Sequence, residues 1–171
     1  MNRNLYRIVL VVTTCMVLVI LGTDVMAKSK TCSLTGTWLG EAGSTWMAIA
    51  SRGKSSTTGQ LHLEWVSIDP TFGGEFPSAV RVSNGVGVWE QINNKEYKWS
   101  WVLYGFDASG TVVYTRRSSG TSSLADCDHT DDTYVDELWL SGHDINTDPA
   151  DSCGSGTGTQ TRMPLVQAVC K

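Results

Sequence analysis

Beyond its first 27 residues, the sequence lacks an amphipathic helical repeat of useful length. It is also short of basic residues, with 13 Lys and Arg against 17 Asp and Glu in the whole chain. No stretch gathers Lys and Arg into a stripe that could neutralise phosphate groups. We therefore predict neither a nucleic-acid partner nor electrostatic attachment to an anionic membrane.

Residue spacings typical of metal sites and of hydrolases are missing as well. No Cys-x-x-Cys pair occurs, and His62, His129 and His143 do not have the spacing of zinc ligands. The Gly-x-Ser-x-Gly motif of many hydrolases is also absent. We predict a protein that needs no metal or cofactor and is not an enzyme. One enzymatic alternative stays open, in which Glu64 and Glu90 form a glycosidase-like carboxylate pair across a barrel.

The first 27 residues are typical of a secretory signal peptide. Arg3 and Arg7 precede an uncharged, largely apolar run over residues 8–22, and small residues follow at the cleavage position. That run is shorter than the roughly 20 residues that a membrane-spanning helix needs. We therefore expect residues 1–27 to be removed. Residues 28–171 would then form one exported domain, either periplasmic or extracellular.

Four cysteines remain after the expected cleavage. Because compartments outside the cytoplasm are oxidising, two disulfides are the simplest arrangement. Three pairings are possible. As a hypothesis we favour Cys32–Cys170, which would tie the two ends of the domain together, with Cys127–Cys153, which would brace a long acidic segment.

Residues 96–106 form the clearest alternating run. One face of this predicted strand collects four large side chains, Tyr97, Trp99, Trp101 and Leu103. A tight turn over residues 107–110 follows it. Similar runs predict strands at residues 34–40, 45–51, 60–67, 79–83, 86–91, 111–117, 121–125, 133–141 and 159–169.

Short strands of this number predict an all-β fold, an antiparallel barrel of roughly eight strands. Polar loops are expected at residues 69–76 and 141–158. The seven Trp of the chain suit either a filled core or an aromatic-lined cavity. We predict non-catalytic binding of a small apolar or amphipathic molecule; the alternative is a filled structural or protein-interaction barrel. The expected lining is Trp99, Trp101, Leu103, Tyr97, Trp65 and Trp89.

The start of the domain, residues 32–38 (CSLTGTW), resembles the calycin superfamily of lipocalins, fatty-acid-binding proteins and avidins. In those barrels the Trp of a Gly-x-Trp motif closes one end, and a basic residue on the last strand packs over it. The resemblance therefore implies a structural stacked pair, Trp38 with Arg162. Residues 85–123 look most like uncharacterised bacterial exported calycin-like proteins.

Avidins give the sharper resemblance. Residues 34–38 followed by Gly43 and Ser44 look like the first hairpin of that family, and residues 142–144 are similar to a late avidin motif. The resemblance implies that Ser44 and Asp144 contact biotin. Two positions depart from the family, because Gly40 stands where an Asn is expected and Leu61 where a Tyr is expected. Each missing hydrogen bond to a buried ureido oxygen costs roughly 1–3 kcal/mol. High-affinity biotin binding is therefore not expected.

The segment from Asp126 to Glu137 carries six acidic residues and no Lys or Arg. We interpret it as a solvated acidic loop held by Cys127. Its spacing lacks the order of an EF-hand calcium loop. A calcium site stays open as an alternative, with ligands Asp126, Asp128, Asp131 and Asp132.

Overall fold

The computed structural model describes residues 32–41, 44–71 and 73–164, which belong to the second of two compact units, residues 32–171. The predicted signal peptide and Cys170 lie outside the described residues. Every regular element in the described part is a strand. Among these residues no helix has the length and apolarity needed to cross a membrane.

Nine strands follow one another along the chain. They are β1 (Gly36–Glu41), β2 (Thr45–Arg52), β3 (Thr58–Ser67), β4 (Arg81–Val82), β5 (Gly85–Gln91), β6 (Glu96–Phe106), β7 (Val112–Leu124), β8 (His129–Leu140) and β9 (Ser152–Arg162).

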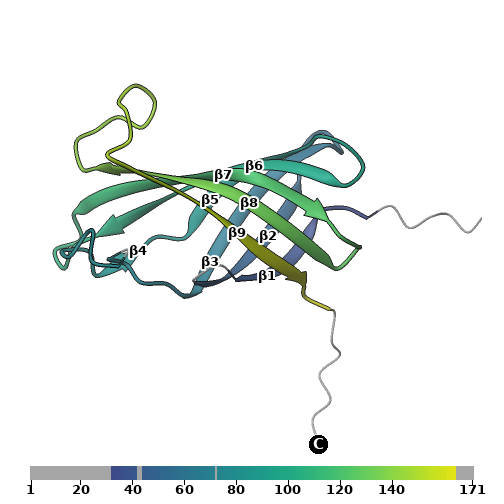
Figure 1. The fold of residues 1–171 in the computed structure, drawn as a ribbon, viewed down its shortest axis with the longest axis horizontal. Helices are drawn as coiled ribbons and strands as arrows, with labels where there is room; N and C mark the ends of the chain where they lie inside the picture. The colour runs from purple at the N-terminus through teal and green to yellow at the C-terminus, as the bar shows by residue number, and fades with distance from the viewer. Residues whose placement is uncertain (1–31, 42–43, 72, 165–171) are drawn as a thin grey trace, which may run out of the picture. The chain divides into compact units, whose positions relative to one another are not determined.

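Eight of these strands close into an antiparallel barrel (Figure 1). The hydrogen-bonded order runs β6-β5-β3-β2-β1-β9-β8-β7, and pairing of β6 with β7 completes the circle. The two-residue strand β4 adds to β6 beside this circle. The predicted all-β, eight-stranded antiparallel barrel is thus confirmed.

Side chains alternate between the inside and the outside of the barrel, as the sequence of β6 shows. Tyr97, Trp101 and Leu103 are buried, whereas Lys98 and Tyr104, each next to a buried residue, are exposed. The turn that follows is closed by its own side chain, because the carboxylate of Asp107 accepts hydrogen bonds from the backbone N–H groups of Ser109 and Thr111, at 2.9 Å each.

Trp38 and Arg162 close one end of the barrel. The Arg162 guanidinium lies 4.3 Å from the centre of the Trp38 ring. The same guanidinium donates to the carbonyl oxygens of Thr35 at 2.7 Å and Cys127 at 2.8 Å. A Cβ atom on Gly36 would lie 2.3 Å from the Arg162 side chain. The glycine of the Gly-x-Trp motif therefore makes room for the arginine that covers the tryptophan.

The predicted disulfide pairing is wrong. Cys32 is bonded to Cys127, with 4.8 Å between their Cα atoms, and Cys153 is an exposed free cysteine. Cys153 pairs in register with Glu137, ten residues along the chain from Cys127. At about 3.4 Å per residue that span is roughly 30 Å, far beyond the reach of a disulfide. With Cys32 already bonded, Cys32–Cys170 is excluded as well.

The last third of the barrel differs most from the sequence prediction. The runs predicted at residues 111–117 and 121–125 form one continuous strand, β7, of 13 residues. Most of the predicted acidic loop belongs to β8, and β9 begins at Ser152, inside the predicted loop 141–158. These strands present polar groups and glycine to the interior, so their sequences lack the apolar alternation that indicates a strand.

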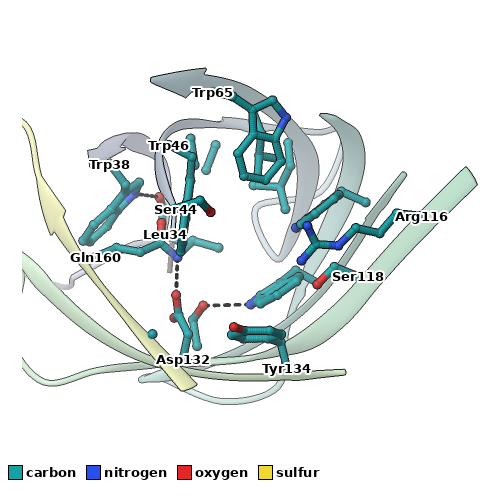
Figure 2. Close-up of a pocket in the computed structure, with 18 residues that line it drawn as sticks. Leu34, Trp38, Ser44, Trp46, Trp65, Arg116, Ser118, Asp132, Tyr134 and Gln160 are labelled. Atoms are coloured by element: carbon teal, nitrogen blue, oxygen red, sulfur yellow. Dashed lines mark hydrogen bonds between the residues drawn. The ribbon is translucent and has the colours of Figure 1, made fainter. Parts of the chain in front are cut away.

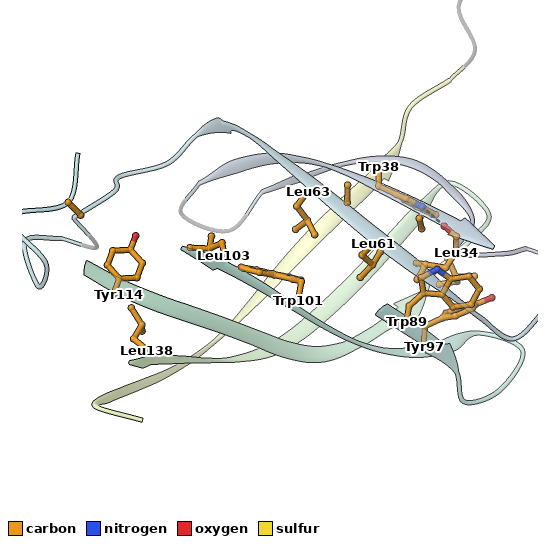
Figure 3. Close-up of a cluster of buried hydrophobic side chains, with 14 of the residues drawn as sticks. Leu34, Trp38, Leu61, Leu63, Trp89, Tyr97, Trp101, Leu103, Tyr114 and Leu138 are labelled. Carbon is orange, nitrogen blue, oxygen red and sulfur yellow. Dashed lines mark hydrogen bonds between the residues drawn. The ribbon is translucent and has the colours of Figure 1, made fainter. Parts of the chain in front are cut away.

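The buried apolar side chains pack into a group near each end of the barrel, and Leu61, Leu63 and Trp101 lie between these two groups (Figure 3). At one end Leu34, Trp38, Trp89 and Tyr97 pack together. At the other end the Tyr114 ring stacks on Phe76 of the β3–β4 connection, with ring centres 4.5 Å apart. The space between these two clusters holds the polar groups described next.

Candidate functional site

An internal cavity of about 60 Å³ lies between the two apolar clusters (Figure 2). Its lining comes from β1, β2, β3, β6, β7, β8 and β9, together with residues that precede β1 and β2. Most of the lining side chains divide by chemistry into two groups. We call the apolar group, Trp46, Ala48, Ala50, Leu61, Leu63, Trp65, Trp99 and Trp101, the indole wall. We call the other group, Arg116, Ser118, Ser122, Asp132, Tyr134, Gly158 and Gln160, the polar wall.

Edge-to-face contacts hold three tryptophans of the indole wall in place. The ring centre of Trp65 lies 6.2 Å from that of Trp46 and 5.6 Å from that of Trp101. Aromatic pairs prefer this geometry, which adds about 0.5–1.5 kcal/mol per pair beyond burial. The indole N–H of Trp65 is buried and finds no acceptor in the part of the chain that the structure describes.

Small residues leave space between the tryptophans. Ala48 and Ala50 occupy the inward positions of β2 after Trp46. On β1, a Cβ atom at Gly40 would lie 2.3 Å from the Trp46 ring. The departure from the avidin pattern at Gly40 thus has a physical reason, because Trp46 occupies the volume that an asparagine side chain would need.

Asp132 is the most deeply buried charged residue of the polar wall, with 3% of its surface exposed. The carboxylate oxygen Oδ2 accepts a hydrogen bond from the side-chain amide of Gln160 on β9. The other oxygen, Oδ1, is buried and has no hydrogen-bond partner among the described residues. Burial raises the pKa of this carboxyl, and hydrogen bonding by the side chains of Ser122, Gln160 and Thr130 acts in the opposite direction.

Arg116 supplies the positive charge of the polar wall. Its side chain is buried and forms an ion pair with Asp136, the residue four positions beyond Asp132 on β8. The Arg116 guanidinium also lies 5.1 Å from the centre of the Trp101 ring. One arginine therefore connects the two walls, by an ion pair on the polar side and a cation–π contact on the aromatic side.

A second link between the walls runs through Trp99. Its indole N–H donates to the hydroxyl of Ser122 at 2.9 Å. Ser122 itself is fully buried on β7, next to the strand that carries Asp132. The hydroxyl fixes the orientation of the Trp99 ring at the boundary of the cavity.

Three glycines leave the inner face of β9 largely without side chains. Gly154, Gly156 and Gly158 occupy alternate positions on the face that continues with Gln160 and Arg162. A Cβ atom at Gly156 would lie 2.5 Å from the Tyr134 hydroxyl. The absent side chains on β9 therefore provide the room that the Tyr134 ring and the cavity occupy.

The structure brings together four of the seven residues predicted to contact a ligand. Trp65, Trp99, Trp101 and Ser44 line the cavity. Tyr97, Trp89 and Leu103 face inward but are packed into the core, away from this lining. Trp46 and the polar wall were not predicted from the sequence as cavity lining; of the polar wall only Asp132 was named, as a possible calcium ligand. The alternating Gly-x-Gly-x-Gly-x-Gln run of β9 was the one available indication of that wall.

Residues named for other functions lie elsewhere. Asp144 is exposed in the β8–β9 connection, where it accepts from the N–H of Asn146 at 2.8 Å, and it does not line the cavity. Glu64 and Glu90 are exposed on the outside of the barrel, and Glu90 pairs with Lys98 at 3.0 Å. A carboxylate pair across the lumen is therefore excluded for these two residues.

The acidic segment does not converge on a cation. Asp131 points outward and Asp132 inward, because adjacent residues of a strand face opposite sides of the sheet. Asp126 instead holds the ring of His129, with 2.9 Å between carboxylate and Nδ1. No group of three or more acidic, His or Cys side chains placed to hold a metal ion occurs within the described ranges.

This fold defines an architecture, the closed eight-stranded antiparallel barrel. No family model and no curated protein matches the chain. Among solved structures, the X-ray structure of a biotin-binding protein from chicken is similar, with a TM-score of 0.50 and 13% sequence identity. The match covers 80% of this chain and 100% of the chicken chain. At that identity the likeness extends to the fold alone.

Proposed function

We propose that this protein is an exported, non-catalytic barrel that binds a small amphipathic molecule in its lumen. The observation that carries the proposal is the division of the cavity into an indole wall and a polar wall. Binding sites for small molecules are typically apolar, with a few placed polar groups that fix orientation. Two buried atoms of the cavity lining have no hydrogen-bond partner within the described residues, Oδ1 of Asp132 and Nε1 of Trp65. The first can accept a hydrogen bond from a ligand, and the second can donate one.

Export is part of this proposal. Residues 1–27 have the composition of a signal peptide, and residues 28–171 would be the mature domain. The Cys32–Cys127 disulfide supports export, because such bonds persist in oxidising compartments. The resemblance of residues 85–123 to bacterial exported calycin-like proteins points in the same direction.

The size of the cavity limits the ligand. A volume of about 60 Å³, at roughly 10–15 Å³ for each water molecule, accommodates about four to six waters. We therefore expect a compact ligand, or one compact group of a larger molecule. Its apolar body would lie on the indole wall, and its polar end would face β7, β8 and β9.

Biotin is a useful test compound but a poor candidate ligand. The similar chicken structure is that of a biotin-binding protein. In this chain, however, Trp46 fills the volume beside Gly40, and Asp144 lies outside the cavity. We expect biotin to bind weakly or not at all.

Two measurements test the proposal. Native mass spectrometry of protein purified from an exporting host should reveal a retained small molecule that is lost on denaturation. A titration with isobutanol, followed through the indole N–H resonances of the tryptophans, should move the signals of Trp46 and Trp65. The outward-facing indole of Trp139 is the internal control, because it is buried away from the cavity under the β8–β9 connection.

The competing function is a filled structural barrel, and it predicts the opposite outcome. The cluster of buried apolar side chains fills much of the barrel interior, which favours this alternative. A bare mass together with unmoved indole resonances would establish it and would rule out the binding proposal.

A further inference from the structure

We propose that the ligand is a small organic cation, whose ammonium group pairs with Asp132 while its apolar body lies against the indole wall. The inference rests on the proposed function and names the class of molecule that the cavity selects. It follows from the charges inside the barrel, from the tryptophan rings that surround them and from the volume between the two walls.

The charges in the lumen do not balance. The polar wall carries Arg116 and Asp132, and Arg116 forms its ion pair with Asp136 rather than with Asp132. The side chains that hydrogen-bond Asp132 are all neutral: the amide of Gln160 and the hydroxyls of Ser122 and Thr130. Asp132 has only 3% of its surface exposed. Its carboxylate thus lacks a counter-charge in the described part of the barrel.

Asp132 needs both a hydrogen-bond donor for Oδ1 and a positive charge, and a neutral N–H donor would supply only the first. It would complete the hydrogen bonding of Oδ1 but would leave the buried negative charge uncompensated. Burying an unpaired charge is far more costly than burying a paired one. An ammonium group supplies both the hydrogen bond and the charge, and charge-assisted hydrogen bonds are roughly twice as strong as neutral ones.

The indole wall, like Asp132 on the polar wall, favours a cation. Tryptophan is the best aromatic partner for a cation, and organic ammonium ligands are commonly held by several aromatic rings. This barrel already uses such contacts at Arg116 over Trp101, at 5.1 Å, and at Arg162 over Trp38, at 4.3 Å. Trp46, Trp65 and Trp99 line the same cavity, and none of them is covered by a cation in the described structure.

Matched probes separate charge from shape. Isobutylamine and isobutanol have nearly the same size, and isobutyrate carries the opposite charge. We would titrate each probe at pH 8 and follow the indole N–H resonances. Isobutylamine should bind about 10-fold more tightly than isobutanol, because its charge-assisted hydrogen bond to Asp132 is roughly twice as strong as the neutral one that the alcohol can form. Isobutyrate should not bind.

Two variants locate the effect. Asp132→Asn keeps the shape of the side chain and should reduce the preference for the amine to about 2-fold or less, as the charge is removed. Asp131→Asn removes a neighbouring charge from the outer surface and should keep the full preference.

The outcomes separate the two proposals. Equal affinity for isobutylamine and isobutanol in the native protein would overturn the cation inference and leave the binding function intact. A preference for the amine that survives in Asp132→Asn would overturn the assignment of the site. If isobutylamine moves no indole resonance, the inference fails, and the isobutanol titration then decides whether the barrel binds small molecules.

Discussion

The indole wall and the polar wall belong to the same closed sheet, yet they differ in almost every physical respect. On β3 the inward residues include Leu61, Leu63 and Trp65, which bury apolar surface and need no partners beyond close packing. On β8 the inward residues include Asp132 and Asp136, each of which needs a partner for every buried polar atom.

This difference assigns separate tasks to the two halves of the barrel. Apolar burial contributes roughly 25 cal/mol for each Å² removed from water, so burial of the indole wall stabilises the fold. A buried polar wall costs free energy unless it is fully paired. The unpaired Oδ1 of Asp132 is therefore a sign that the polar wall is arranged for a ligand rather than for stability.

The largest expected effect is on the indole wall. Trp101→Ala should lower the free energy of unfolding by about 4 kcal/mol, because it removes a buried ring that contacts both Trp65 and Arg116. Urea denaturation would measure the change. The adjacent variant Val102→Ala faces outward and should cost less than about 1 kcal/mol. Equal losses at the two positions would contradict the division between the walls.

Removing the cation that connects the walls should have the next largest effect. Arg116→Met leaves the largely buried Asp136 without its counter-charge and should cost roughly 3 kcal/mol in urea denaturation. The double variant Arg116→Met with Asp136→Leu should recover most of that loss, because neither charge remains. Arg117→Met, which breaks a more exposed ion pair with Glu137, should cost about 1 kcal/mol or less.

On the polar wall, Asp132→Asn should stabilise the protein. Because burial raises the pKa of Asp132 in the folded state, the folded protein holds this proton to higher pH than the unfolded chain does. The stability of the native protein therefore falls as pH rises from the ordinary pKa of 3.8 through the raised folded-state value.

The stability of Asp132→Asn does not depend on this titration. Its gain in free energy of unfolding over the native protein should therefore be absent below the pH range of the titration and reach roughly 1–2 kcal/mol above it. Thermal melts across acidic to neutral pH would measure the difference. A variant that is less stable than the native protein at neutral pH would show that Asp132 is fully paired inside the barrel.

The smallest expected change in stability separates an open lumen from a filled one. Ala48→Val adds two carbons toward the cavity and should alter the free energy of unfolding by less than about 1 kcal/mol, because space is available. The same change should weaken isobutanol binding about 10-fold. Ile49→Val, on the outer face of the same strand, is the control. A loss of 2–3 kcal/mol, as expected for overpacking, would indicate a filled core.

The same comparison explains which parts of the fold could be predicted from sequence. The run of residues 96–106 alternates large apolar and polar side chains, so both the strand and its inward face were predictable. The Gly-x-Trp motif at Gly36 and Trp38 likewise indicated which residue closes one end, and Arg162 lies over that Trp38 ring.

The polar wall could not be predicted in the same way. The inward positions of β8 hold Thr130, Asp132 and Asp136, and a period-two pattern of polar residues looks like a loop when only hydrophobicity is counted. The wrong prediction of the disulfide pairing followed from the same error, because the start of β8 was predicted to be a loop. Once β8 is known to be a strand, Cys127 falls in the turn beside Cys32, and the pairing follows from distance.

The glycines on the inner face of β9 determine how substitutions can change the volume of the lumen. At Gly154, Gly156 and Gly158 any replacement adds atoms, so single mutations on this strand can only narrow the interior. At Trp46 and Trp65 nearly every replacement removes atoms, so single mutations there can only widen it. The volume of the lumen can thus be adjusted in either direction from different strands, while the charged groups on β7 and β8 stay unchanged.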